Sequence, residues 1–314
     1  MLHLITLKDW SRGQIEEVLD LAVEMKKAPE KFYDSMRRKT LVMIFEKPSL
    51  RTRVSFEAGM CQMGGHAIFY NMATSPLGIG KETIYDTVKV LSRYTDLIMA
   101  RLFEHEKIEE MARYAEIPVI NGLTDFSHPC QILADLMTIR EHKGSFEGRT
   151  LAYLGDGKNN VTYSLLYGCP KVGLNIRVGC PEDKEYRPLS EVVDYASKSG
   201  KQSGVSVKIT HDPFEAVEGA DIIYTDSWMS YHIPPEELEA RVKVLKPFQV
   251  DQTKMKWAAR DAIFMNCLPA LRGYEQTAEV IDGPQSVVFD QAENRLHTQK
   301  AIILTLVKKS SPRR

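Results

Sequence analysis

Between residues 45 and 57 the chain reads FEKPSLRTRVSFE. The apolar run at 40–45 predicts a buried strand, and apolar residues at roughly helical spacing from Val54 onward predict a helix. Pro48 and Ser49 therefore fall at a strand-to-helix turn, and Ser49 is the expected N-cap. Such a turn points unpaired backbone N–H groups and the positive end of the helix dipole at one spot, which suits a phosphate.

Polar side chains in the same turn add to its capacity to bind an anion. Ser49 and Thr52 supply hydroxyl donors. Arg51 and Arg53 supply positive charge and forked guanidinium donors. Taken alone, the segment fits equally well a capped helix that displays two solvated arginines, so the rest of the chain has to decide between these interpretations.

The composition is that of an ordinary globular protein. At 314 residues the chain is too long for one ordinary core and suits two domains of about 150 residues each. Hydrophobic residues make up 43% and charged residues 26% of it, as in a typical soluble chain. The net charge of −1 gives no reason to expect a nucleic acid or an acidic membrane as a partner. No apolar run reaches the roughly 18–20 residues that span a bilayer.

The cysteines and the N-terminus indicate a cytoplasmic protein. Five cysteines are scattered along the chain, at positions 61, 130, 169, 180 and 267. An odd number without paired spacing argues for a reducing compartment and against a zinc cluster. The first residues enter an amphipathic pattern directly and lack the layout of a signal peptide. We therefore expect the protein in the cytoplasm.

Short apolar runs alternate with helical patterns along the whole chain. Strands are expected at residues 40–45, 67–70, 96–100, 118–121, 150–154, 175–179, 220–225 and 261–265. Strands that alternate with helices of about 10–15 residues indicate βαβ units and parallel sheets. The polar connection 143–149 interrupts the pattern. This predicts an α/β fold with two doubly wound domains, each with a central parallel sheet, and a boundary near 140–150.

Candidate active residues of the first half lie at the carboxyl ends of expected strands, where parallel sheets gather their functional groups. Ser49, Arg51 and Arg101 are placed in this way. His128 precedes the helical stretch 132–142, where the helix dipole disfavours the charged imidazole and leaves a neutral donor. A histidine that merely caps a buried helix is the alternative.

A glycine-rich turn opens the second half. The residues 155–157, Gly-Asp-Gly, follow a strand and precede a helix, which is half of a dinucleotide fingerprint. Asn160 stands where the third glycine is needed, although Glu182 and Asp183 supply a downstream acid. The half-match is weak evidence for NAD, and a nicotinamide-dependent dehydrogenase is kept only as a minor alternative.

Oxygen acceptors follow the strand at 220–225. Asp226 and Ser230 can hold an ammonium group, and Trp228 between them favours a formed pocket. A simple loop cap is the common alternative for such residues.

Two later segments carry further candidate groups. Pro269 is expected to force Leu268 into an extended geometry that exposes its carbonyl and that of Cys267. Cys267 is a nucleophile, a polar wall or simply a buried thiol, and the last is the default. Arg295 is expected to start the apolar helix 298–307, from which it can point into a cleft.

Seven segments, in this order, resemble the aspartate/ornithine carbamoyltransferase family, and its ornithine branch most closely. They are FEKPSLRTR at 45–53, MAR at 99–101, HPCQ at 128–131, GD at 155–156 with NN at 159–160, DSW at 226–228, CLP at 267–269 and ENR at 293–295. Any one of them is a modest signal. Seven in order, within a resemblance that runs from about residue 3 to 307, are a strong one.

The resemblance implies that residues 1–140, with a returning helix at about 292–308 that packs on them, form a domain that binds carbamoyl phosphate. The phosphate would contact Ser49, the amides of Leu50, Arg51 and Thr52, and Arg101. The carbamoyl group would be held by His128, Gln131, Arg295 and the carbonyls of Cys267 and Leu268. The catalytic side chains implied by the family are Arg51, Arg101, His128, Cys267 and Arg295.

Residues 141–291 are implied to form the amino-acid-binding domain. Asn160 would take the α-carboxylate, and Asp226 and Ser230 would take the α-amino group, with a backbone contact from Tyr231. The side-chain amine of ornithine would attack the carbamoyl carbon and release phosphate, giving citrulline without a metal or organic cofactor. Members of the family are typically trimers, so a homotrimer is expected.

Three departures from the ornithine pattern leave the acceptor open. Ser230 is followed by Tyr231-His232 instead of Met-Gly, Asn266 replaces the usual His before Cys-Leu-Pro, and Pro76 stands where a loop Gln usually reaches a neighbouring subunit. Leu50 for the usual Thr matters less, because the backbone amide does the binding there. These changes suit a different amine acceptor, simple drift in an ornithine enzyme, or a catalytically weak homologue kept as a binding or regulatory subunit.

Overall fold

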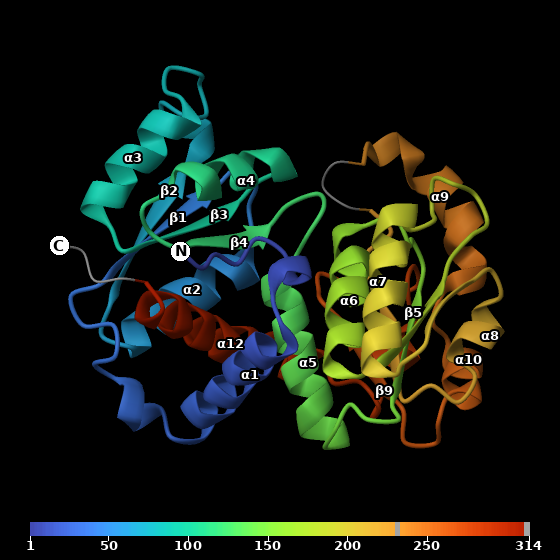
Figure 1. The fold of residues 1–314 in the computed structure, drawn as a ribbon. Helices are drawn as coiled ribbons and strands as arrows, with labels where there is room; N and C mark the ends of the chain where they lie inside the picture. The colour runs from blue at the N-terminus through green and yellow to red at the C-terminus, as the bar shows by residue number, and fades with distance from the viewer. Residues whose placement is uncertain (230–232, 311–314) are drawn as a thin grey trace. The chain divides into compact units, whose positions relative to one another are not determined.

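The computed structural model describes residues 1–229 and 233–310. The chain divides into two compact units, one of Met1–Met137 with Glu293–Arg314 and one of Thr138–Ala292. The limits of the units fall inside two long helices, α5 (Pro129–Lys143) and α12 (Val288–Lys308). Each unit is described by itself below, with the labels of Figure 1.

The first unit is built on a parallel sheet with the strand order β2-β1-β3-β4. Its strands are β1 (Thr40–Phe45), β2 (His66–Asn71), β3 (Leu97–Arg101) and β4 (Val119–Leu123). Its helices are α1 (Arg12–Lys27), α2 (Leu50–Gln62), α3 (Ile84–Tyr94), α4 (His105–Tyr114) and the parts of α5 and α12 that belong to it, with short 3-10 turns at Leu7–Asp9, Pro29–Phe32 and Met72–Thr74. Every residue of β3 is buried, which explains why its first four residues, 97–100, read as an uninterrupted apolar run before Arg101.

Helices cover both faces of this sheet (Figure 1). Val42 and Ile98 point towards α3 and α4, where they join a buried apolar cluster with Val88 and Ile108. On the other face, α12 packs back on the unit: Lys300 donates to Gln62 of α2 at 3.0 Å. The doubly wound fold and the returning C-terminal helix expected from the sequence are therefore confirmed.

The second unit is built on a five-stranded parallel sheet with the order β7-β6-β5-β8-β9. Its strands are β5 (Thr150–Leu154), β6 (Asn175–Gly179), β7 (Val207–Thr210), β8 (Ile222–Thr225) and β9 (Ile263–Asn266). Its helices are α6 (Asn160–Val172), α7 (Ser190–Ser203), α8 (Pro213–Val217), α9 (Leu238–Leu245), α10 (Gln252–Trp257) and α11 (Ala278–Ile281), with 3-10 turns at Pro235–Glu237 and Lys246–Phe248. The edge strand β7 is absent from the strands expected above.

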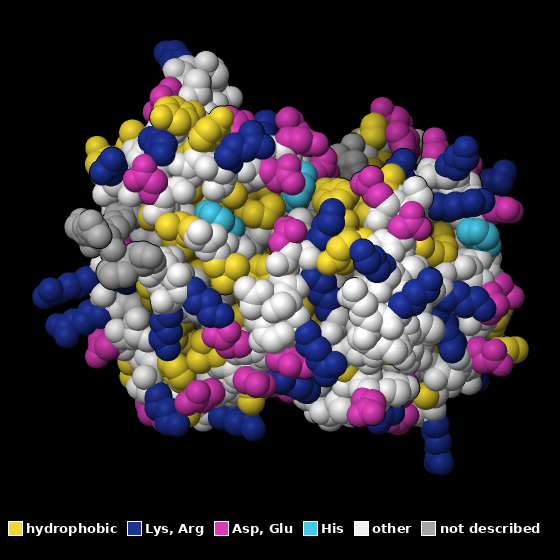
Figure 2. Space-filling model, viewed as in Figure 1, with side chains coloured by type: hydrophobic (Ala, Val, Ile, Leu, Met, Phe, Trp, Pro, Cys, Tyr) yellow, Lys and Arg dark blue, Asp and Glu magenta, His cyan; other side chains and the backbone are white. Residues whose placement is uncertain are grey.

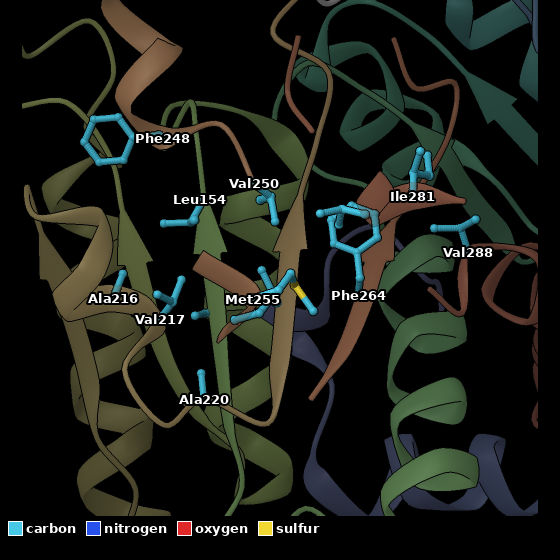
Figure 3. Close-up of a cluster of buried hydrophobic side chains, with 13 residues drawn as sticks. Leu154, Ala216, Val217, Ala220, Phe248, Val250, Met255, Phe264, Ile281 and Val288 are labelled. Atoms are coloured by element: carbon cyan, nitrogen blue, oxygen red, sulfur yellow. The ribbon is translucent and has the colours of Figure 1, made fainter. Parts of the chain in front are cut away.

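Figure 3 shows the apolar core on one face of this second sheet. Leu154 and Phe264 project from the strands and meet Val217 of α8, Met255 of α10 and Ile281 of α11. Burial of this apolar surface is the main term that stabilises the unit. On the opposite face lie α6 and α7, packed side by side (Figure 1).

The last helix, α12, starts earlier than the sequence analysis expected. The helix begins at Val288, so Arg295 lies two turns inside it and does not start it. The reason is that the buried face of its first half is polar: Gln291, Asn294 and Arg295 are each at most 2% exposed. Their spacing is helical, but a search for apolar periodicity passes over such a face.

The surface carries both signs of charge. Figure 2 shows acidic and basic side chains interspersed over the face in view, in keeping with the net charge of −1. Within the described ranges, no helix is long and apolar enough to cross a membrane.

The carboxyl group of Glu275, in the second unit, is buried in a way that disfavours its ionised form. Glu275 is 1% exposed, and its Oε1 accepts a hydrogen bond from the Leu271 amide at 2.8 Å. Its Oε2 is buried without a hydrogen-bond partner in the described part of the chain. Burial, with a smaller contribution from the charge of Asp226, raises the pKa of Glu275 from 4.5 to about 7.

This pKa predicts a pH-dependent stability. The folded state binds the Glu275 proton more tightly than the unfolded chain, so the stability that the protonated form confers is complete below pH 4.5 and is lost as the pH rises to about 7. Glu275→Gln cannot ionise, so it should not lose stability between pH 4.5 and about 7. The unfolding free energy of the variant minus that of the wild type should therefore increase by up to about 3 kcal/mol over this pH range.

Urea unfolding at several pH values measures this difference, with the exposed Glu279→Gln as the matched control. An advantage of Glu275→Gln that is the same at all pH values, or equal to that of Glu279→Gln, contradicts the assignment.

Candidate active site

The candidate residues of the first unit gather where β1, β3 and β4 end. Phe45, the last residue of β1, pairs with Arg101, and Arg101 pairs with Leu123 at the end of β4. Because the strands are parallel, the segments that follow them emerge at one edge of the sheet. Ser49 follows β1 and His128 follows β4 at this edge.

The turn after β1 leads into α2 as the sequence predicts. Ser49 is the N-cap, and its hydroxyl accepts a hydrogen bond from the Thr52 amide at 3.3 Å. The capped start leaves further backbone N–H groups of the first helical turn directed outward. Arg51 lies in this turn and is half-buried.

Lys47 was missed by the sequence reasoning and belongs to the same edge. It is 5% exposed, and its ammonium lies 4.5 Å from the centre of the Phe103 ring. Burial and the nearby charge of Arg101 lower the pKa of Lys47 from 10.5 to about 8. A lysine directly before Pro48 in a strand-to-helix turn is the signal that could have found it.

Arg295 reaches this edge from α12. Its Nη1 donates to Gln131 Oε1 at 2.6 Å, and its Nη2 donates to Thr52 Oγ1 at 3.3 Å. Gln131 in turn donates to Asp135 at 2.8 Å. These bonds fix a guanidinium that is 2% exposed against the starts of both α2 and α5.

His128 is surrounded by positive charge. The pKa of the imidazole is lowered well below 6.5, chiefly by burial and further by Arg295, Arg101, Lys47 and Arg51. Burial and the four cations favour the same neutral form that the helix dipole is expected to favour. The first unit thus brings together His128, Gln131, Arg295 and the residues of the Ser49 turn, in an arrangement that attracts an anion and offers a neutral imidazole beside it.

The candidate residues of the second unit gather where β5, β8 and β9 end. Leu154 pairs with Thr225, and Thr225 pairs with Asn266. Asp226 and Cys267, which directly follow the last two strands, are in contact: Cys267 Sγ donates to Asp226 Oδ1 at 3.0 Å.

Asp226 is a buried carboxyl group at 8% exposure. Burial raises its pKa, opposed by the hydrogen bonds from Cys267 and from the Ser227 amide. An ammonium group placed beside Asp226 would compensate for this burial and favour its ionised form. Cys267 therefore lines a polar site, while Cys130, with its pKa raised to about 12 by burial, is an inert core thiol.

The two asparagines after β5 have different surroundings. Asn159 is the N-cap of α6, and its side chain bonds to the Thr162 amide, the Tyr153 hydroxyl and the Asp156 carbonyl. Its hydrogen-bonding capacity is largely used inside the protein. Asn160 is the first residue of α6 and is half-buried, so it is the better placed of the two to contact a small molecule.

The expected extended geometry of Leu268 is wrong. Leu268 has φ = 56°, in the left-handed region, and the peptide bond to Pro269 is cis. The Leu268 amide donates to Asn266 Oδ1 at 2.8 Å, an Asx-type turn that reverses the chain. The side-chain Nδ2 of Asn266 donates to Gln276 Oε1 at 3.0 Å, so Asn266 acts in the structure of the turn.

Four residues singled out in the sequence remain to be considered. Ser230, Tyr231 and His232 lie outside the described residues. Pro76 is exposed in the loop that follows β2.

Two family models match the chain. One, described as the carbamoyl-P binding domain of aspartate/ornithine carbamoyltransferase, covers residues 2–141, and the other, the Asp/Orn binding domain of the same family, covers residues 147–306.

Known proteins are similar over nearly the whole chain. An ornithine carbamoyltransferase of Bacillus subtilis is 52% identical over 98% of this chain and 94% of its own. One of Anoxybacillus flavithermus is 50% identical over 96% of each chain. The solved ornithine carbamoyltransferase of Pyrococcus furiosus superposes with a TM-score of 0.93 at 48% identity, over 98% of this chain and 97% of that one. With both halves matched and relatives near 50% identity, the chain belongs to the aspartate/ornithine carbamoyltransferase family.

Proposed function

We propose that the protein transfers the carbamoyl group of carbamoyl phosphate to the side-chain amine of L-ornithine, giving L-citrulline and phosphate. The observation that carries the proposal is the cluster of Lys47, Arg51, Arg101 and Arg295 around the neutral His128. A dianionic phosphate joined to a polar carbamoyl group complements this arrangement in charge and in hydrogen bonding.

In the first unit, the phosphate lies at the start of α2. It accepts hydrogen bonds from the Ser49 hydroxyl and the amides of Leu50, Arg51 and Thr52, and the charges of Arg51 and Arg101 balance its own. Lys47 adds a further cation below its pKa of about 8.

The carbamoyl group lies against the start of α5. His128 and Arg295 donate to its oxygen, where negative charge grows as the amine attacks. Gln131 Oε1 accepts one bond from Arg295 and keeps a second lone pair for the carbamoyl N–H. Each such charge-assisted bond contributes on the order of 1.5–3 kcal/mol.

In the second unit, the amino acid lies at the ends of β5 and β8. Asp226 accepts from the α-ammonium, with Cys267 fixed beside it, and Asn160 donates to the α-carboxylate. The neutral side-chain amine forms a bond to the carbamoyl carbon, while the bond from that carbon to the phosphate oxygen breaks and phosphate leaves with the electron pair. The departing phosphate takes up the proton that the amine loses, so the products are citrulline and hydrogen phosphate.

Ornithine is favoured as the acceptor by the names of the relatives near 50% identity. The structure weakens one of the reasons for doubt, because Asn266 is fully buried and is engaged with Leu268 and Gln276.

The acceptor is tested by incubating the purified protein with carbamoyl phosphate and, separately, L-ornithine, putrescine, L-lysine, N-acetyl-L-ornithine and L-aspartate. Phosphate release and the carbamoylated product are both measured. We expect citrulline from ornithine, with kcat/KM at least about 10²-fold above that of the other amines. Faster transfer to another amine would overturn the choice of acceptor, and no transfer to any would overturn the function.

The role of the cation cluster is tested in the same assay. Arg101→Gln should lower kcat/KM by roughly 10²–10³-fold, because it removes one fixed donor and its charge. Arg93→Gln, the same change at an exposed position on α3, should leave it unchanged. Equal activities of the two variants would remove Arg101 from the site.

A homotrimer and a cytoplasmic location complete the proposal. All five cysteines are free thiols, which fits a reducing compartment. Leu50 and Val54 of α2 are 73% and 52% exposed, and Phe69 on the edge strand β2 is 37% exposed. The Phe69 ring lies 3.9 Å from the guanidinium of Arg53, which also belongs to α2. Apolar side chains grouped beside a sheet edge suit contact with a second copy of the chain.

Light scattering should give three times the mass of the chain. Val54→Glu should lower this mass, because it places a charge in the contact. Val90→Glu, at an exposed position on α3, should not. A monomeric wild type, or trimers unaffected by Val54→Glu, would contradict the proposed contact.

A further inference from the structure

A buried ion pair joins the two segments that are assigned to the amino acid. Asp156 follows β5 and precedes α6, and Arg241 lies on α9. Arg241 Nη2 donates to Asp156 Oδ2, and the two residues are 9% and 6% exposed.

The arginine also holds the turn after β8. Arg241 Nε donates to the carbonyl of Trp228 at 2.8 Å, two residues beyond Asp226. The forked guanidinium therefore bonds to both segments at once, and its fixed geometry sets their spacing.

The aspartate holds the turn into α6. Asp156 Oδ1 accepts from the Lys158 amide at 2.8 Å, and the Asp156 carbonyl accepts from the Asn159 side chain at 2.7 Å. Asn159 is the N-cap that precedes Asn160. The position of Asn160 is thus linked to Asp156 through two successive residues.

Apolar packing shields the pair from water. The Arg241 guanidinium lies 5.1 Å from the centre of the Tyr186 ring, and Tyr186, Trp228 and Leu245 form a small buried cluster. The two turns also touch: a Cβ atom at Gly155 would lie 3.3 Å from Trp228 Nε1. A charge left alone here would be buried and uncompensated, so the turns would have to shift to solvate it.

The same unit contains a second Arg–Asp pair, in which the arginine side chain is more exposed, at 35%, than that of Arg241, at 11%. Arg149 Nη1 donates to Asp221 Oδ1 at 2.6 Å, and Asp221 Oδ2 accepts from the Thr150 amide at 2.9 Å. These residues lie where β5 and β8 begin, at the opposite edge of the sheet from Asp226 and Asn160. The second pair is therefore a control for a purely structural role.

We propose that Arg241 and Asp156 are positioning residues for the amino-acid substrate, which hold Asp226 and Asn160 at the separation that the α-ammonium and α-carboxylate require. The inference rests on the proposed carbamoyl transfer to ornithine. It adds two residues that do not touch the substrate and yet set its affinity.

The test compares Arg241→Met with Arg149→Met in the citrulline assay. A misplacement of binding or reacting groups by about 1 Å can lower the efficiency of an enzyme by roughly 10²-fold. Arg241→Met should therefore raise KM for ornithine by up to that factor. It should leave KM for carbamoyl phosphate unchanged, because that substrate is assigned to the other unit. Arg149→Met should change neither KM.

Two milder variants keep the test decisive if Arg241→Met does not fold. Asp156→Asn preserves the size of the side chain and its acceptor for Lys158 but removes the charge, and it should raise KM for ornithine in the same selective way. Arg241→Lys keeps the charge but loses the forked contact, so it should restore only part of the affinity. Calorimetric binding of L-norvaline, which has the α-groups of ornithine without the side-chain amine, should weaken in parallel.

The contradicting results are specific. Unchanged ornithine KM and norvaline affinity in both Arg241→Met and Asp156→Asn would overturn the inference, as would an equal rise of both KM values or the same effect from Arg149→Met. Failure of the wild type to form citrulline would instead overturn the proposed function.

Discussion

The site of the first unit depends on positive charge held around an imidazole that must remain neutral. Lys47, Arg51, Arg101 and Arg295 all act on His128, and like charges gathered in a buried site repel one another. The fold resists this repulsion by fixing Arg295 to Gln131 and Thr52. A bound dianion would relieve it, and the proposed reaction would use the same positive charge to stabilise the departing phosphate.

The second unit uses the same sheet geometry with the opposite charge. Asp226 is placed at the end of β8 as a buried carboxyl whose pKa is raised, and an ammonium group would complete it. Cys267, in the turn after β9, donates to Asp226. Trp228, in the turn after β8, is fixed through its carbonyl, which accepts from Arg241. In each unit, parallel strands bring groups from distant parts of the sequence to one edge, and the charges gathered there suit a ligand group of the opposite sign.

The strands could be predicted because buried parallel strands read as apolar runs, and the edge where the candidate residues gather could be predicted because it lies at the ends of those strands. The edge strand β7 was missed because only Thr210 of its four residues is buried. The start of α12 was misplaced because its buried face, Gln291 to Arg295, is polar. Lys47 and the geometry of Leu268 were missed although each has a local signal: a lysine directly before Pro48 in a strand-to-helix turn, and an asparagine two residues before Leu268 that can form an Asx turn. The lowered pKa of Lys47, in contrast, depends on burial and on Arg101, which is far away in the sequence.

The most direct test of this account is the protonation state of His128. NMR of histidine-labelled protein, with the resonance assigned through His128→Asn, follows the imidazole from about pH 8 to about pH 5, a range that spans the ordinary histidine pKa. We predict a neutral ring throughout, because burial and four cations lower its pKa well below 6.5. A ring that becomes protonated near pH 6.5 would contradict the charge arrangement on which the site is built.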